Sequence, residues 1–110
     1  MKATNTYLES IIKHLKNEKA VLVYFGTTSC SVVEAFEPKI KTLLKIEFPK
    51  MRFLKIDINE MPMAAAHFQA FVEPTVLVFF EGKEAIRRSR TISISELETT
   101  IKRLYSLIFN

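Results

Sequence analysis

Residues 21–30 read VLVYFGTTSC, and this stretch decides the fold. Apolar and aromatic side chains, typical of a buried strand, run through a short polar turn into a helical pattern that begins at Ser31. Cys30, the only cysteine of the chain, lies at this junction. Unpaired N–H groups and the helix dipole at a helix N-terminus favour a thiolate over a thiol. The alternative is an inert cysteine, since free cysteine is commonly a core residue.

The composition indicates one globular domain over residues 1–110. The 110 residues are 48% hydrophobic with only 2 Gly and 4 Pro, which excludes disorder. One cysteine excludes an internal disulfide and a multi-cysteine zinc site, and it suits a reducing compartment. No apolar run approaches the ~20 residues that a membrane helix needs, and the net charge of +4 is spread along the chain. We therefore expect a soluble, cytoplasmic protein whose partner is neither a membrane nor a nucleic acid.

Helical and strand patterns alternate along the rest of the chain. Helices are predicted where apolar residues recur at helical spacing, and strands where short apolar runs are bounded by turn residues. The predicted order is a helix to about Asn17, strand 20–25, helix 31–48, strand 51–58, helix 62–69, strand 75–80, strand 84–89 and a helix from Ser95. This order predicts an α/β fold of three layers, α/β/α, with a mixed central sheet. We expect parallel strands joined by crossovers, and one antiparallel hairpin strand at an edge. In such sheets the site lies beyond the carboxyl ends of the strands, where Cys30 falls.

Two features of the predicted helices depend on particular residues. Pro38, inside the second helix, predicts a kink because its ring excludes the hydrogen bond to the preceding turn. Ser95 and Glu98 match a capping box, which would start the last helix at Ser95. The first feature concerns the helix that follows Cys30, and the second concerns the helix that ends the chain.

Five short stretches, in order and at matching spacing, resemble the thioredoxin family over nearly the whole chain. The strand that ends in Cys30 resembles the one that leads to the family's C-G-P-C site, with Cys30 as the nucleophile. The other four are the kink proline Pro38, the segment Asp57–Pro62, the cis-proline loop Glu73-Pro74-Thr75 and the hairpin glycine Gly82. The resemblance implies the thioredoxin fold and thiol–disulfide exchange.

The chain departs from the family at its active site. The motif reads Cys30-Ser31-Val32-Val33, so Val33 stands at the resolving cysteine, and a thioredoxin cycle needs both thiols. Tyr24 stands where the family usually has a buried aspartate that assists proton transfer, while Lys55 keeps the place of that aspartate's lysine neighbour. Three more changes affect the expected recognition surface, namely Gly26 and Ser29 in place of tryptophans and Arg90 near a groove glycine. The resemblance therefore implies altered proton transfer and altered recognition.

Pro74 has two interpretations. As a plain turn proline it would follow a trans peptide bond, the common state. By resemblance the bond is cis, Pro74 contacts Cys30, and the substrate-binding residues are Glu73, Pro74 and Thr75, with the Glu73 backbone pairing with an extended substrate. We favour cis, because a proline that begins an apolar strand otherwise lacks a reason. The Glu73 carboxylate would then oppose a thiolate at Cys30, and Arg90 would favour it.

The remaining candidates are weaker. His14 and His67 have no cysteine or acidic partner at metal-ligand spacing, so neither a metal nor another cofactor is expected. Met61, Met63 and Phe71 are core and loop residues that the resembled fold would bring to the edge of the site. Basic residues gather at the edge hairpin, where a solvated edge explains them better than a nucleic-acid patch; they are Lys83, Arg87, Arg88 and Arg90.

Two classes of function follow. In the first, the protein is a monothiol redox protein: Cys30 forms mixed disulfides with protein clients or glutathione-type thiols, and an outside thiol resolves them. In the second, it is a non-catalytic binding or adaptor module that keeps the groove. A monothiol glutaredoxin with an iron–sulfur cluster is disfavoured, because CSVV does not resemble C-G-F-S. In either class we expect a monomer or a weak dimer.

Overall fold

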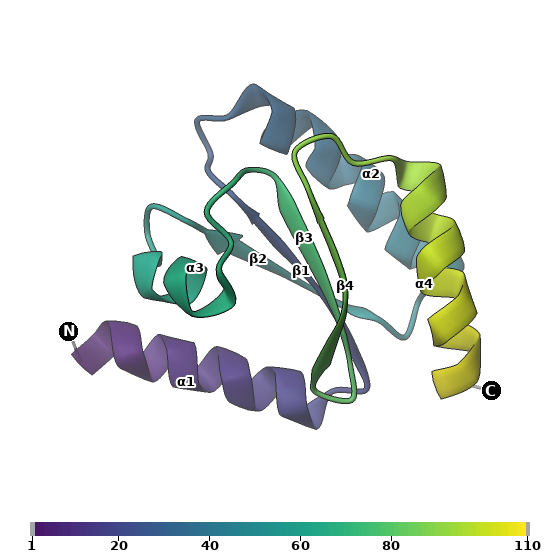
Figure 1. The fold of residues 1–110 in the computed structure, drawn as a ribbon, viewed down its shortest axis with the longest axis horizontal. Helices are drawn as coiled ribbons and strands as arrows, with labels where there is room; N and C mark the ends of the chain where they lie inside the picture. Colours follow the sequence, from purple (N-terminus) through teal and green to yellow (C-terminus); the bar gives the residue numbers. More distant parts are fainter. Residues whose placement is uncertain (1, 110) are drawn as a thin grey trace.

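The computed structural model describes the backbone of residues 2–109 and the side chains of residues 6–109 (Figure 1). Its elements alternate as the sequence predicts, and the ends differ from the predicted ones by at most one residue. They are α1 (Lys2–Asn17), β1 (Ala20–Gly26), α2 (Ser31–Glu47), β2 (Arg52–Asp57), α3 (Pro62–Phe68), β3 (Thr75–Phe80), β4 (Lys83–Ser89) and α4 (Ile94–Ile108). The α/β assignment of the sequence is confirmed.

The strands form one mixed sheet in the order β2-β1-β3-β4. Only β1 and β2 pair in parallel, whereas β3 is antiparallel to β1 and β4 is antiparallel to β3, so β3 alone runs opposite to the other three strands. The expectation that only the hairpin strand would be antiparallel is therefore wrong. The reason is the length of α3, whose 7 residues extend only about 10 Å. This helix does not carry the chain back along a strand of about 20 Å, so β3 starts at the end of the sheet where β2 stops.

Two helices cover each face of the sheet: α1 and α3 on one side, α2 and α4 on the other (Figure 1). Because successive side chains of a strand point to opposite faces, β1 contributes to both cores. Val21, Val23 and Phe25 pack on the side of α1 and α3, and Leu22 and Tyr24 pack on the side of α2 and α4. Every residue of β1 and β3 is buried, as expected for central strands covered on both faces.

The last helix begins earlier than its predicted capping box. Ser93 is the N-cap, and its hydroxyl accepts a hydrogen bond from the Glu96 backbone N–H at 3.2 Å. The pattern of serine followed three residues later by glutamate occurs twice here, at Ser93 and at Ser95, and the structure uses the first. This register packs Ile94 against the core of α2 and α4, which burial favours. The prediction of a cap at Ser95 is therefore wrong by two residues.

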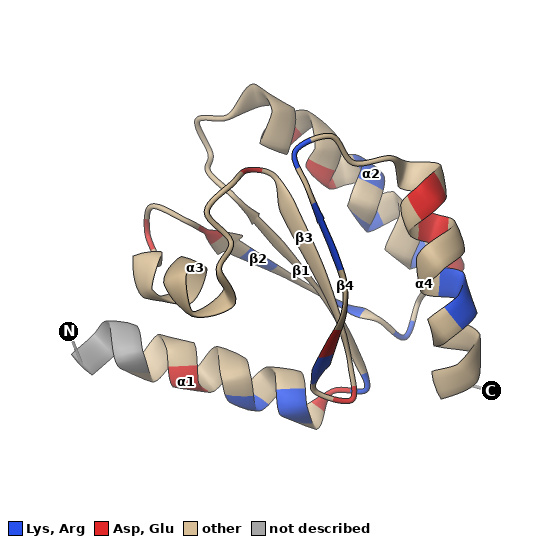
Figure 2. Cartoon of the chain, viewed as in Figure 1, with Lys and Arg blue, Asp and Glu red and all other residues tan. Residues whose placement is uncertain are grey.

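Basic residues colour β4 blue in Figure 2, and two of them attach helices to the sheet. The Arg87 guanidinium donates to the carbonyls of Phe68 and Gln69 at the end of α3, at 2.7 and 3.1 Å, and pairs with Glu84. Arg88 pairs with Glu96 of α4 at 2.8 Å. These contacts explain Arg87 and Arg88 as structural residues of the edge strand.

Pro38 lies inside α2, and the helix continues on both sides of it. Pro62 is at the start of α3. A backbone N–H at this position would have no partner within the helix, so the missing N–H of proline costs no hydrogen bond. Within the described residues, no helix combines the length and the apolar character needed to span a membrane.

Candidate functional site around Cys30

Three loops meet at one end of the sheet. Phe25, near the end of β1, pairs with Thr75, the first residue of β3, and Thr75 pairs with Ser89, the last residue of β4. The loop that carries Cys30, the loop that carries Pro74 and the loop after β4 are therefore neighbours (Figure 1). The sequence predicted a site at this end of the sheet, because the carboxyl end of the strand before Cys30 lies there.

Cys30 is the N-cap residue of α2. Its backbone is extended (φ −92°, ψ 114°), and its carbonyl accepts the N–H of Glu34 at 3.1 Å. Its own N–H donates to the Thr27 carbonyl at 3.4 Å. The side chain is partly exposed and packs against the core shared with α2 and α4. Cys30 therefore begins a helix, as expected, and its side chain retains access to solvent.

The rest of the motif divides into an exposed part and a buried part. Ser31 and Val32 are exposed, and Val32 has 58% of its surface accessible. Val33 is fully buried. A shallow hollow of about 460 Å³ lies beside the motif, lined by Ser31, Val32, Ala35, Phe36 and Lys39. The surface next to Cys30 is therefore largely apolar, and the position one turn after Cys30 belongs to the core.

Tyr24 is buried beneath the motif. Its hydroxyl donates to the Val33 carbonyl at 2.7 Å, and its ring packs against those of Phe36 and Phe53. Burial, followed by the negative charges of Glu37, Cys30 and Glu73, raises the pKa of Tyr24 to about 12. At neutral pH the phenol is therefore a hydrogen-bond donor, and it offers no carboxylate to accept a proton from the site.

Lys55 is engaged by a carboxylate that sequence reasoning missed. Lys55 Nζ lies 2.6 Å from Glu37 Oε1, and Lys41 Nζ lies 3.0 Å from Glu37 Oε2. The hydrogen bond from Lys55, followed by that from Lys41, holds the pKa of Glu37 below its ordinary value despite the opposing effect of burial. Lys55 is also the register partner of Tyr24 between β2 and β1. The lysine thus keeps a carboxylate partner, which comes from α2 instead of from β1.

The Glu73–Pro74 peptide bond is cis. The Pro74 carbonyl accepts the backbone N–H of Arg90 at 2.9 Å, which joins the loop to the end of β4. Thr75, the third predicted substrate-binding residue, is buried, and its hydroxyl donates to the Val72 carbonyl at 2.5 Å. Arg90 is exposed and has a positive φ of 67°, a conformation that suits glycine better than arginine.

The Glu73 side chain points to the Cys30 loop. Its Oε1 accepts the backbone N–H of Thr27 at 2.8 Å and the Thr27 hydroxyl at 2.9 Å. The Thr27 hydroxyl also lies 3.3 Å from that of Ser29. Thr27 is a second residue that sequence reasoning missed, because a threonine in a polar turn carries no signal of a partner 46 residues away.

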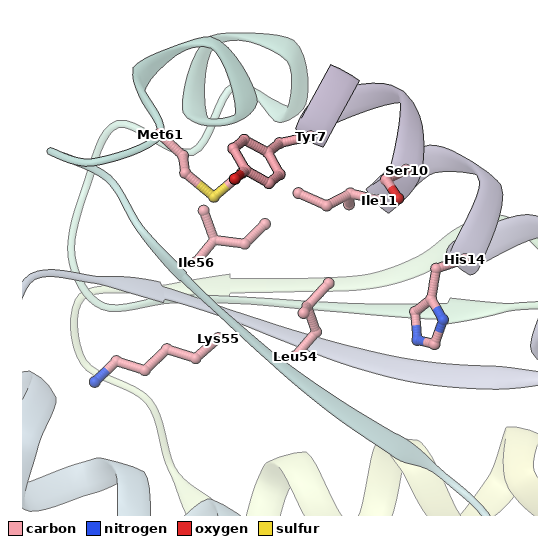
Figure 3. Close-up of a pocket in the computed structure, with 8 residues that line it drawn as sticks. All are labelled: Tyr7, Ser10, Ile11, His14, Leu54, Lys55, Ile56 and Met61. Atoms are coloured by element: carbon pink, nitrogen blue, oxygen red, sulfur yellow. The ribbon is translucent and has the colours of Figure 1, made fainter. Parts of the chain in front are cut away.

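The predicted edge residues divide between two places. Met63 and Phe71 are exposed, Phe71 at 69%. Met61 instead lines a pocket of about 410 Å³ between α1 and β2, together with Tyr7, Ser10, Ile11, His14, Leu54, Lys55 and Ile56 (Figure 3). No residue of the three loops lines this pocket. In Figure 3 the amine of Lys55 points away from Met61 and Tyr7.

Gly26, expected at the recognition surface, is buried.

Over the described residues, no three His, Cys, Asp or Glu side chains gather as a metal site would require. The two histidines lie on separate helices, His14 on α1 and His67 on α3. His67 packs against the Phe68 ring.

Replacing Tyr24 with phenylalanine is expected to lower the free energy of unfolding at neutral pH by about 1 kcal/mol, because a buried hydrogen bond is lost. The variant should also lose part of its alkaline sensitivity. Between the ordinary phenol pKa of 10.0 and the native value of about 12, the native state keeps a proton that the unfolded chain has released. The contribution of Tyr24 is therefore fully present below pH 10 and is lost as the pH rises toward 12.

Urea unfolding of both proteins over this pH range checks the expectation. The two proteins share every other ionisable side chain, so the difference between them isolates the effect of Tyr24. A difference in stability between the two proteins that stays constant with pH would contradict the expected behaviour of Tyr24.

Comparison with known proteins agrees with the geometry. The sequence profile of the Thioredoxin family matches residues 1–103. Thioredoxin-like protein YdfQ of Bacillus subtilis (strain 168) is 30% identical over 100 residues, which are 91% of this chain and 88% of that protein. Thioredoxin 1 of Thermosipho africanus TCF52B has a TM-score of 0.73 and is 33% identical, covering 82% of this chain and 99% of that chain. For Fasciola hepatica thioredoxin the TM-score is 0.74 at 30% identity, with 90% and 92% covered. With this fold, and with Cys30 at the start of α2, the chain belongs to the thioredoxin family.

Proposed function

We propose that the protein is a monothiol thiol–disulfide exchange protein in which Cys30 is the nucleophile. The observation that carries the proposal is a partly exposed cysteine at the N-cap of α2, at the end of the sheet where the Pro74 loop also lies. Membership of a redox family supports it. The thiolate of Cys30 is the attacking species in such an exchange.

The exchange is a displacement at sulfur. The Cys30 thiolate attacks one sulfur of a disulfide, the new bond joins Cys30 Sγ to that sulfur, and the old S–S bond breaks. The other sulfur of the disulfide leaves as a thiolate and takes up one proton from solvent. This proton balances the one that the Cys30 thiol released when it became a thiolate. Cys30 is oxidised to a mixed disulfide, and the released thiol is the reduced product.

The chain holds no thiol that could release this mixed disulfide, because Cys30 is its only cysteine. A buried valine stands one turn later. We therefore infer that an outside thiol, either from a protein client or from a small thiol, completes the exchange. In the absence of such a thiol, the mixed disulfide persists.

The surface around Cys30 supports protein clients as partners. Val32, two residues after Cys30, and Phe71, in the segment that leads to Pro74, are exposed apolar side chains, and exposed apolar surface is typical of interaction sites. In the proposed complex, an extended client segment pairs with the backbone of Glu73 beside Pro74. The buried Tyr24 favours a second candidate, an adaptor that binds clients without turnover, because it replaces the proton acceptor that turnover uses.

Incubation with an oxidised peptide that contains one disulfide is expected to yield a stable adduct on Cys30, observed by intact-protein mass spectrometry. Excess dithiothreitol should release it. The control is Cys30→Ser, which should form no adduct. In insulin reduction driven by thioredoxin reductase the protein should show little turnover, because no second thiol completes the cycle. Failure to form the adduct would refute the exchange function and leave the adaptor, whereas vigorous insulin reduction would refute the monothiol mechanism.

A further inference from the structure

The Glu73 carboxylate is fixed near Cys30 by hydrogen bonds. Two donors of Thr27 hold its Oε1, at 2.8 and 2.9 Å. The Thr27 carbonyl in turn accepts the N–H of Cys30 at 3.4 Å. Thr27 is buried and Glu73 is half-buried. The carboxylate is therefore part of the wall of the site, and its position follows that of the Cys30 loop.

The charges around the thiol are unequal in their exposure. Glu34, in the first turn of α2, adds a second negative charge but is exposed. Arg90 carries the opposite charge, is exposed, and forms no ion pair among the described side chains. Solvent and salt screen exposed charges more strongly than half-buried ones. The field of Glu73 is therefore the least screened of the three.

We propose that Glu73 makes the Cys30 site select uncharged and cationic disulfides over anionic ones. This inference rests on the proposed exchange function and names its substrate class. A disulfide that carries carboxylates would bring like charge against a fixed carboxylate in a partly desolvated site, which costs free energy in the attack. Among small partners, glutathione disulfide, which bears carboxylates, is then disfavoured, and clients with basic residues beside the disulfide are favoured.

Three small disulfides of similar size test the selectivity: cystamine is cationic, bis(2-hydroxyethyl) disulfide is neutral and dithiodiglycolate is anionic. Acid quenching and mass spectrometry give the rate at which each one forms the mixed disulfide on Cys30. The ratio of the cationic rate to the anionic rate does not depend on the fraction of Cys30 that is ionised. Differences in intrinsic reactivity among the reagents cancel when the same ratio is compared between variants.

The informative variant is Glu73→Gln, which removes the charge and keeps an oxygen that can accept from Thr27. The ratio of cationic to anionic rates is expected to fall about fivefold at low ionic strength. The control is Glu47→Gln, which removes one charge at the far end of α2, about 25 Å along the helix from Cys30. The control should keep the ratio of the unmodified protein.

An equal ratio in the unmodified protein and Glu73→Gln would overturn the inference while the exchange function stands. A measurement on the unmodified protein serves if the variant does not fold. Raising the salt concentration should reduce the ratio of cationic to anionic rates toward that of a neutral model thiol, N-acetylcysteine amide. If the protein and the model thiol already have equal ratios at low salt, the inference is also overturned. If none of the three reagents modifies Cys30, the exchange function itself fails, and this inference with it.

Discussion

Replacing Gly26 with alanine is expected to lower the free energy of unfolding by about 3 kcal/mol, the cost of overpacking a core. A Cβ at this position would lie 2.5 Å from Cγ1 and 2.7 Å from Cγ2 of Val33. Val33 is fully buried, and its branched side chain has few alternative rotamers. The backbone at position 26 and the Val33 side chain must therefore shift to make room. Urea unfolding of the variant measures the loss.

A double-mutant cycle identifies the cause. Shortening the neighbour with Val33→Ala should relieve the clash, so Gly26→Ala combined with Val33→Ala should be about 2 kcal/mol more stable than the sum of the single effects. Gly82→Ala is the control. Gly82 has a positive φ of 83°, and alanine there costs about 1 kcal/mol through backbone strain, which should add to Val33→Ala without coupling. Additivity of the Gly26 and Val33 effects would contradict the proposed contact.

Introducing a second thiol with Val33→Cys is expected to change the chemistry of the protein from one-thiol to two-thiol exchange. Position 33 follows the N-cap Cys30 by three residues, and Cα atoms at this helical spacing are about 5 Å apart, within the range that a disulfide bridges. Mild oxidation should therefore remove two hydrogen atoms from the variant, which intact-protein mass spectrometry detects. The control is Val32→Cys, because residues two apart on a helix do not face each other.

The variant Val33→Cys should also gain insulin reductase activity with dithiothreitol, because the second thiol can release the mixed disulfide. The turnover should stay below that of a two-cysteine thioredoxin. Tyr24, buried and with its pKa raised to about 12, cannot take the proton that an aspartate would accept. If Val33→Cys oxidises no more readily than Val32→Cys, the start of α2 is not arranged as described, and the proposed function loses its geometric basis.

Local patterns in the sequence predicted much of this molecule. The strand 20–25, the helix after Cys30 and the apolar strand from Thr75 each depend on neighbours in the chain, and each is present. The direction of β3 was missed because it depends on the length of α3, not on the sequence of the strand itself. The cap of α4 was missed because two serines offered the same pattern, and only packing of Ile94 distinguishes them.

The contacts around the candidate site were less accessible to sequence reasoning. Lys55 was identified, but its partner Glu37 lies on another element. Glu37 and Lys41 have the spacing of a helical ion pair. This spacing predicts a contact between these two residues, but it does not predict that Lys55 also pairs with Glu37. Glu73 was identified for its backbone and for the charge of its carboxylate, but the contact of that carboxylate with Thr27 was not predicted. Such contacts join segments that are distant in sequence, and one chain read alone does not specify them.

Arg87 has a consequence for how the molecule opens. One guanidinium on the edge strand β4 holds the last carbonyls of α3, whose chain then leads to the loop of Glu73 and Pro74. Local unfolding proceeds in cooperative units, each with its own opening free energy. Because this side chain ties helix to strand, fraying of the exposed edge β4 would also break both of its hydrogen bonds to the end of α3. Opening of the outermost strand is thus coupled to the segment that leads into the loop beside Cys30, although one is an edge and the other a wall of the site.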